Sequence, residues 1–431
     1  MCTSDLALYP LLGAVIGSLL GPLHAARLVA ATDLVWALLA VQSLHPADLA
    51  RGLPGLQTAR ARQAQRRVRR GLARPWLGSK HLTPLLIAAA LRLMPAGEVI
   101  AVLDSTRCWR WEIFSIGVRW HGRVLPVAWE ILAYPWPQNA FTPTVITLVD
   151  RLLAAWPAER AVHLVADRGF PSLKLFRCLE RWSATRRVGS TIRLRASDWV
   201  RLSAGPPIRL GVLEQEVAFG TWRSVPASYH QRHHGGPISL LVIGKGIPLV
   251  PPHQRGEADR ARCAARLARR HQHLASKGQG TAVLTDRVWA LLSTRASWRE
   301  AVQTYTQRFA TEGTYRDLKS WDLARVATHE TDPTHLDGLL GVACLAYLIQ
   351  AALGAAAGRT SDGEARARQD QWSTTDRLSL FWRGRQVLHD RAHDWRPWLQ
   401  DVLRTLAQHP DHPFAAPRES RRSPVGAKEA A

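Results

Sequence analysis

The chain from Val99 to Ile131 reads VIAVLDSTRCWRWEIFSIGVRWHGRVLPVAWEI. This pattern predicts three successive strands, because the pair His121-Gly122 is typical of a tight turn between Ile113–Trp120 and Arg123–Ile131. The first strand is an apolar run that ends in Asp104. An apolar run of this length indicates a buried strand. We therefore expect Asp104 at the exit of a buried strand, on the edge of a sheet, where sites are usually built.

A second apolar run has the same form. It extends from Ala161 to Ala166 and ends in Asp167. Either aspartate alone is more often a turn or cap residue than a ligand. Three antiparallel strands, a helix, a fourth strand and another helix predict a mixed α/β sheet flanked by helices, in which Asp104 and Asp167 can meet. The other predicted elements are helices at about Pro143–Trp156 and Pro171–Trp182 and a strand at Ser190–Leu194.

Four later residues have the spacing Y-x2-R-x3-E-x6-K, namely Tyr305, Arg308, Glu312 and Lys319. At about 100° per residue, one α-helix would present all four on a single narrow face. A carboxylate among two cations and a phenol suits metal and phosphate chemistry. Taken alone, the stripe is more often a solvated helix with fortuitous charges. Asp317 lies about 140° around the helix from Glu312, so we expect it to point elsewhere.

These segments resemble the insertion-sequence-4 family of DDE transposases. The resemblance covers roughly residues 95 to 350. It implies a ribonuclease-H-like catalytic core that cuts and joins DNA ends with two divalent metals. The matching segments are Tyr305-Thr306-Gln307-Arg308 through Glu312, Tyr315-Arg316-Asp317-Leu318-Lys319-Ser320, Leu103-Asp104-Ser105-Thr106 and Ala166-Asp167-Arg168-Gly169-Phe170.

The resemblance also implies roles for the individual residues. Asp104 would be the ligand shared by two Mg²⁺ ions, with Asp167 and Glu312 each holding one, and Mn²⁺ is an expected substitute. Arg308 and Lys319 would grip phosphates beside the cut. Tyr305 would pack or donate a hydrogen bond to the backbone.

The spacing between Asp167 and Glu312 is longer than one strand and one helix require, so we expect an insertion. Its predicted strands are Leu213–Phe219, Ile238–Ile243, Thr281–Leu284 and Val288–Leu292, and its predicted helix is Ala258–Ser276. The predicted parts of the chain are a helical DNA-binding domain (1–95), the first part of the catalytic core (96–197), a largely β-stranded insertion (198–292), the second part of the core with the signature helix (293–355), and a helical C-terminal region with a basic tail (356–431).

The chain is strongly basic, with 57 Lys and Arg against 34 Asp and Glu and a net charge of +23. Such an excess favours nucleic acid as the partner, although an arginine-rich genome composition gives the same signal. Two arginine-rich helical segments are candidate phosphate contacts. The arginines of the first segment would cover more of the helix circumference than a helix that packs on the core allows. The alternative interpretation of this segment is a solvated surface. The predicted DNA-binding arginines are Arg66, Arg67, Arg69 and Arg70 in the first segment and Arg262 and Arg266 in the second.

The N-terminal region is expected to form buried helices, with Asp33 as a helix cap. Its apolar segment near Leu11–Leu20 is too short to span a membrane. The cysteines are scattered, odd in number and without a C-x2-C pair, which argues against a disulfide framework or a structural zinc site. A reducing cytoplasm, with association to the nucleoid, fits these features.

The expected function is therefore that of a DNA transposase of a bacterial insertion sequence, acting on terminal inverted repeats and target DNA. A homodimer is the simplest assembly that holds two DNA ends together. A catalytically inactive DNA-binding descendant and a nuclease without strand transfer are the alternatives. Three tryptophans, Trp222, Trp289 and Trp298, are candidates for stacking a flipped base, although packing roles are commoner.

Overall fold

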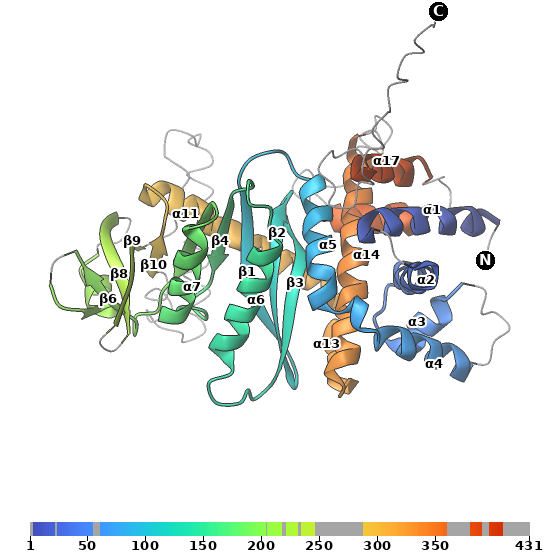
Figure 1. Ribbon diagram of the computed structural model, residues 1–431, viewed down its shortest axis with the longest axis horizontal. Helices are drawn as coiled ribbons and strands as arrows, with labels where there is room; N and C mark the ends of the chain where they lie inside the picture. Colours follow the sequence, from blue (N-terminus) through green and yellow to red (C-terminus); the bar gives the residue numbers. More distant parts are fainter. Residues whose placement is uncertain are drawn as a thin grey trace, which may run out of the picture.

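The computed structural model describes residues 3–21, 24–54, 61–203, 205–217, 221–231, 234–245, 288–359, 380–389 and 396–407. Within these ranges the chain is a mixed α/β protein with a ten-stranded, mostly antiparallel sheet and surrounding helices. The predicted α/β class is confirmed. Figure 1 shows the first four strands of the sheet in the middle of the long axis. The N- and C-terminal helices form a helical body at one end, and strands β6, β8 and β9 of the same sheet lie at the other end.

The first three strands form as expected. They are β1 (Val99–Cys108), β2 (Trp111–Trp120) and β3 (Arg123–Ala133), and they pair antiparallel in sequence order. The predicted turn at His121-Gly122 joins β2 to β3, with φ of 43° and 77°. Two residues with positive φ make the tight hairpin whose twist matches that of the flanking strands, and a glycine takes such a φ without strain.

Two parallel strands extend this meander on the other side of β1. Strand β4 (Val162–Ala166) pairs parallel with β1, and β5 (Val188–Arg193) pairs parallel with β4. Helix α6 (Phe141–Ala155) leads to β4, and α7 (Leu173–Ser183) leads to β5. Parallel neighbours need such crossover helices. The strand order on this side of the sheet is β3-β2-β1-β4-β5.

The remaining strands extend the same sheet instead of forming a separate one. Strand β10 (Val288–Ser293) pairs antiparallel with β5 and with β9 (His234–Lys245). These two strands include the predicted strands Val288–Leu292 and Ile238–Ile243. The sheet then continues through β8 (Trp222–Gln231), β6 (Trp199–Leu202) and β7 (Ile208–Arg209). The predicted strand Thr281–Leu284 and the predicted helix Ala258–Ser276, with Arg262 and Arg266, lie outside the described residues.

The predicted strand Leu213–Phe219 was wrong over residues 213–217, and its last two residues lie outside the described residues. The chain forms helix α8 (Leu210–Gln215) there instead. Leu210, Leu213 and Val217 are buried. Leu210 and Leu213 are three residues apart, so both lie on one face of α8.

The predicted helical N-terminal region is confirmed, although the role of Asp33 is not. Asp33 lies inside α2, not at its start, and it is buried there. It accepts a hydrogen bond of 2.6 Å from the Tyr9 hydroxyl and forms an ion pair with Arg67. The helices of this region are α1 (Thr3–Leu20), α2 (Ala25–Val41), α3 (Pro46–Gly52), α4 (Ala61–Leu72), the 3-10 turn η1 (Pro75–Leu77) and α5 (Ser79–Arg92).

Helix α4, the first arginine-rich segment, also differs from its prediction. Ala64, Val68 and Leu72 are buried at a spacing of four. They form a narrow apolar stripe, so α4 is an amphipathic helix that packs on the core. The arginines occupy the rest of its surface.

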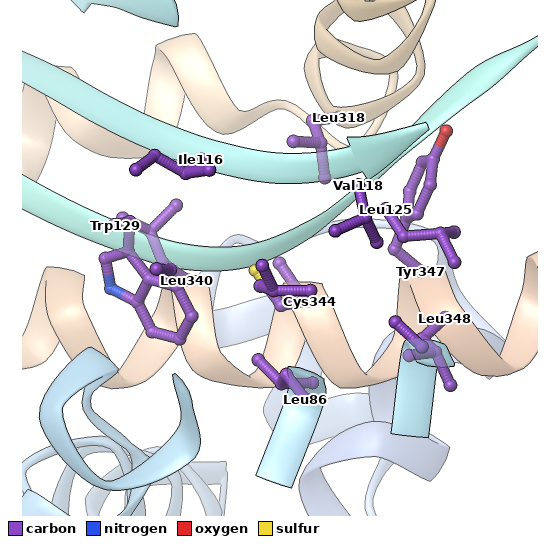
Figure 2. Close-up of a cluster of buried hydrophobic side chains, with 14 of the residues drawn as sticks. Leu86, Ile116, Val118, Leu125, Trp129, Leu318, Leu340, Cys344, Tyr347 and Leu348 are labelled. Carbon is purple, nitrogen blue, oxygen red and sulfur yellow. The ribbon is translucent and has the colours of Figure 1, made fainter. Parts of the chain in front are cut away.

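The C-terminal helices complete the helical body. They are α14 (Pro333–Arg359), α16 (Leu380–His389) and α17 (Arg396–Ala407). Figure 2 shows Leu340, Cys344 and Tyr347 of α14 against β2 and β3, with Leu318 on the opposite side of these strands. Trp129 of β3 also donates a 2.6 Å hydrogen bond to Asp337 of α14. The helical body is thus held firmly to the edge of the sheet.

Helix α14 is the one helix of the described residues that alone is long and apolar enough to cross a membrane, over Pro333–Ala356. Its apolar stretch is 94% buried inside the protein, as in a core helix. Helices α1 and α2 meet the same criterion only as a pair bent by 115°.

Candidate functional site

The register of the sheet brings the two predicted aspartates together. Leu103 of β1 is paired with Ala166 of β4, so the next residues, Asp104 and Asp167, lie side by side. Asp167 follows the last residue of β4, as expected. Asp104 does not lie at a strand exit, because β1 continues to Cys108 and pairs Asp104 with Ser115 of β2. Asp104 is therefore more enclosed than the sequence predicted.

The Y-x2-R-x3-E-x6-K residues do not lie on one continuous helix. Helix α11 (Trp298–Thr306) ends before the 3-10 turn η3 (Gln307–Phe309), and α12 (Ala310–Lys319) begins after it. The predicted single stripe was wrong in this respect, since a 3-10 turn advances the chain by three residues per turn and not 3.6. Arg308 lies in η3, between the helix that carries Tyr305 and the helix that carries Glu312.

Arg308 reaches all three predicted acids. Its Nη1 donates a hydrogen bond of 3.0 Å to Asp104 Oδ2. Its Nη2 lies 3.8 Å from Asp167 Oδ2 and 3.7 Å from Glu312 Oε1. The Arg308 side chain is only 9% exposed, and its Nε is buried without a hydrogen-bond partner. One guanidinium is thus the meeting point of three carboxylates that are far apart in the sequence.

Tyr305 orients the second aspartate. It is fully buried, and its hydroxyl donates a 2.8 Å hydrogen bond to Asp167 Oδ1. The expected bond from Tyr305 to the backbone is therefore replaced by a bond to a carboxylate. Trp289 packs edge-on against the Tyr305 ring at 5.1 Å. Tyr305 is held by this packing, so Asp167 has a fixed orientation.

The two aspartates have opposite pKa shifts. Burial raises the pKa of Asp104 to about 6, and the Arg308 charge and the backbone N–H of Ser105 only partly oppose this effect. Burial also raises the pKa of Asp167, but Arg308, the backbone N–H of Arg168 and the Tyr305 hydroxyl together bring it below its ordinary value. Neighbouring acids with divergent pKa values are typical of functional sites.

Arg308 itself remains charged. Burial lowers its pKa, but the adjacent Tyr305, Asp167, Asp104 and Glu312 raise it above the ordinary value. A buried charge of this kind is stable only while acids surround it. The cation and the acids therefore depend on one another.

Glu312 and Lys319 lie at the periphery. Glu312 is in the first turn of α12 and its side chain is 60% exposed. Lys319 is exposed at the end of α12. Burial of Cys108 raises the pKa of its thiol, and the Lys319 charge partly opposes this effect. Within the described part of the chain no ion pair links Lys319 to the three acids. Lys319 lies towards the far end of β1.

The carboxylates fit a hard cation in kind. Carboxylate oxygens are the ligands that Mg²⁺ prefers. A cation, the Arg308 guanidinium, already lies where these oxygens converge. Among the residues that the structure describes, no three acidic, histidine or cysteine side chains are already arranged around a metal position. Asp104, Asp167 and Glu312 would hold a metal only after Arg308 moves aside.

Two further residues belong to this neighbourhood and were missed from the sequence. Arg193, the last residue of β5, has Nη1 3.8 Å from Asp167 Oδ1. Tyr315 of α12 shares a 2.8 Å hydrogen bond with Ser115, the strand partner of Asp104. The Tyr315 pKa is raised by burial and by the nearby Asp104 charge. Tyr315 was visible only as part of the matching segment, and Arg193 as the end of a predicted strand.

Asp317 points away from the site, as predicted. It is fully buried, its Oδ2 pairs with Arg123 Nε at 2.9 Å, and it accepts a hydrogen bond of 3.1 Å from Tyr347. These contacts tie α12 to β3 and α14. Asp317 therefore has a structural role.

The three tryptophan candidates form one aromatic cluster beside the site. Trp222 and Trp298 stack with their ring centroids 5.9 Å apart and an interplanar angle of 9°. Trp289 contacts Trp222 edge-on and also contacts Tyr305. These contacts are those of a packing cluster that supports Tyr305.

The predicted DNA-binding arginines of α4 lie in the helical body (Figure 1). Arg66, Arg69 and Arg70 are exposed on its surface. Arg67 is also largely exposed, but its guanidinium pairs with Asp33. Three of these four arginines are therefore without an acidic partner among the described residues.

The chain matches no family model, and no curated protein and no solved structure matches it. Support for a function therefore comes from the residues of the site.

Proposed function

We propose that this protein is a DNA transposase similar to the insertion-sequence-4 family of DDE transposases, with a ribonuclease-H-like catalytic core. The observation that carries the proposal is the convergence of Asp104, Asp167 and Glu312 on Arg308. These are four of the residues that carry the resemblance to this family. Surface ion pairs alone would not bring together three acids from such distant parts of the chain.

The topology supports the same proposal. In the order β3-β2-β1-β4-β5, strands β4 and β5 run parallel to β1, which is the arrangement expected of the proposed ribonuclease-H-like core. Asp104 lies on the central strand β1, and Asp167 follows the adjacent β4. In parallel α/β arrangements, sites form beyond the carboxyl ends of the strands, which is where Asp167 lies.

The residues have distinct roles in this proposal. Asp104, Asp167 and Glu312 would hold two Mg²⁺ ions, or Mn²⁺, and these ions would supply activation of the attacking oxygen and charge neutralisation at the leaving one. Arg308 leaves the acids and pairs with a DNA phosphate, for which its planar guanidinium is well shaped. Tyr305 keeps Asp167 oriented, and Lys319 contacts a phosphate farther along the strand.

The partners follow from the reaction. The substrate is double-stranded DNA that carries terminal inverted repeats, and target DNA receives the freed 3′-hydroxyl. The net charge of +23 and the exposed arginines of α4 favour binding of this polyanion. A homodimer in the cytoplasm, associated with the nucleoid, would hold the two ends together.

The test is incubation of the purified protein with a labelled DNA fragment bearing the inverted repeats that flank its own gene. The reactions contain Mg²⁺, Mn²⁺ or EDTA, and the Glu312→Gln variant is assayed beside the wild type. We expect metal-dependent cleavage at the repeat boundary, which the variant loses, followed by joining of the 3′ end to target DNA.

The other outcomes identify the alternatives. Cleavage without joining indicates a nuclease. Binding of the fragment without any cleavage indicates an inactive DNA-binding descendant. Cleavage that Glu312→Gln retains would contradict the assignment of the third acid.

A further inference from the structure

A cavity of about 380 Å³ lies next to the acid cluster and is rich in arginine. Its lining includes Arg168, Arg193 and Arg195, together with the apolar Val288. Glu214 is the acidic side chain of the described lining. Three guanidiniums face one carboxylate in this lining, and Asp167 beside Arg193 offsets part of their charge, so the cavity is suited to an anion chiefly through its guanidinium donors.

The sheet register fixes the place of Arg193 relative to the acids. Ala166 of β4 is paired with Ile192 of β5, so Asp167 and Arg193 are the next residues in the same row. This row continues the one that sets Asp104 beside Asp167. The cavity therefore begins one strand away from Asp167. A ligand with successive phosphate groups would contact the acids and the cavity at the same time.

Arg193 keeps unused hydrogen-bonding capacity. Its side chain is 15% exposed, and its Nε is buried without a hydrogen-bond partner. Its Nη2 donates a long hydrogen bond of 3.4 Å to the Val288 carbonyl, and its Nη1 is 3.8 Å from Asp167 Oδ1. A buried donor without a partner costs free energy, which a bound anion would offset.

Arg195 holds the wall of the cavity in place. Its Nε donates to the Arg168 carbonyl at 2.5 Å, and its Nη2 donates to the Gly169 carbonyl at 2.9 Å. These bonds fix the turn that follows Asp167 and that carries the exposed side chain of Arg168. A binding site whose backbone is already fixed loses less entropy on binding.

We propose that this cavity binds a phosphate group, with Arg168 and Arg193 as its principal ligands. Guanidinium groups match phosphate oxygens in charge and in geometry. If the phosphate belongs to DNA, it is a backbone phosphate of the strand whose neighbouring linkage lies at the acids, and this source depends on the proposed function. If it is free phosphate, the site is independent of that function.

The first arm of the test measures DNA affinity in EDTA as a function of salt concentration, so no cleavage is required. The variants are Arg168→Ala and Arg193→Gln. Arg187→Ala is the matched control, because Arg187 is exposed next to the opposite end of β5. We expect each of the two variants to lower affinity by about tenfold and the salt slope by about 1, with the control unchanged.

The second arm measures thermal unfolding in inorganic phosphate, with ionic strength held constant by sodium chloride. We expect phosphate to raise the melting temperature of the wild type and of Arg187→Ala, and not that of the two variants. Glu214→Gln should increase the phosphate effect, since it removes a negative charge from the lining. Arg168→Ala changes an exposed side chain, so it keeps the test valid even if Arg193→Gln destabilises the fold.

The arms separate the sources of phosphate. An effect in both arms assigns the site to the DNA backbone, and an effect with inorganic phosphate alone assigns it to free phosphate. Unchanged binding of both probes by both variants would overturn the proposal, as would an equal loss in Arg187→Ala. Failure of the protein to cleave its own repeats would overturn the proposed function without affecting either measurement.

Discussion

Two regions of this molecule use the same three residue types in different ways. In the helical body, Asp33 is bound by the Tyr9 hydroxyl and by Arg67. At the sheet, Asp167 is bound by the Tyr305 hydroxyl and lies near Arg308. The first cluster has one acid for one arginine. In the second cluster, Arg308 also forms ion pairs with Asp104 and Glu312.

The difference distinguishes a structural ion pair from a site. The Asp33 cluster is balanced in charge, so it needs no further ligand. In the Asp167 cluster, three carboxylates are opposed by Arg308 and Arg193, and a negative charge remains in a partly buried space. An excess of acid in such a place is costly unless another cation binds. We therefore expect opposite responses of the two regions to metal.

The largest expected effect is that of Arg308→Ala. Removal of one partner from a buried ionic cluster typically costs about 3–5 kcal/mol, and here it leaves Asp104 and Glu312 without their cation and Asp167 with Arg193 alone. Arg67→Ala should cost only about 1 kcal/mol, because the Arg67 side chain is 48% exposed and Tyr9 still binds Asp33. Urea unfolding with and without Mg²⁺ checks this comparison. Mg²⁺ should restore much of the stability of Arg308→Ala and have no effect on Arg67→Ala; equal responses would remove the distinction.

The next effect is a dependence of stability on pH that comes from Asp104. Its pKa is raised to about 6 in the folded protein, against an ordinary value of 3.8. The folded state therefore binds more protons between these values, and stability falls as pH rises from about 4 to about 6. The loss should be roughly 3 kcal/mol at most, from 1.36 kcal/mol per pKa unit. Unfolding curves across this range should show it in the wild type and not in Asp104→Asn; the same slope in both would contradict the assignment.

A smaller effect compares the two tyrosines. Tyr9→Phe and Tyr305→Phe each remove a hydrogen bond to an aspartate, and each should cost roughly 1 kcal/mol of stability. Only Tyr305→Phe should also reduce DNA cleavage, because Asp167 then loses its fixed orientation. Parallel measurements of unfolding and cleavage check this. A similar loss of cleavage in Tyr9→Phe would mean that the effect comes from stability alone.

The smallest effect concerns the arginines of α4. Arg66 and Arg69 are exposed, whereas Arg67 is paired with Asp33. Arg66→Ala and Arg69→Ala should each lower the salt slope of DNA binding by about 1, if each contacts one phosphate. Arg67→Ala should change the slope less. Salt slopes equal to that of the wild type in all three variants would show that these arginines of α4 do not contact DNA.

The parts that the sequence predicted are those set by local patterns. The strand that carries Asp104, the strand before Asp167 and the hairpin at His121-Gly122 each depend on residues close together in the chain. The spacing of Tyr305, Arg308 and Glu312 identified residues that meet, although it predicted the wrong helix geometry. The 3-10 turn at Arg308 could not be read from a spacing that assumes 3.6 residues per turn.

The parts that the sequence missed depend on contacts between distant residues. The local sequence around Asp33 is typical of a helix cap, whereas its ion pair with Arg67 depends on the packing of α4. Arg193 joined the site only through the pairing of β4 with β5. The apolar stripe of Ala64, Val68 and Leu72 is narrow, so the many arginines of α4 led to the prediction that the helix has no core-facing side. Pairing register and long-range ion pairs are tertiary properties, and no local pattern encodes them.

The most direct test of the central claim compares the two aspartates that share the same chemistry. Asp167→Asn and Asp33→Asn are each incubated with the labelled fragment bearing the inverted repeats, in Mg²⁺ and at a temperature where both are folded. We expect that Asp167→Asn binds the fragment and does not cleave it, whereas Asp33→Asn cleaves it as the wild type does. Cleavage by Asp167→Asn at the wild-type rate would contradict the claim that these acids form the catalytic site.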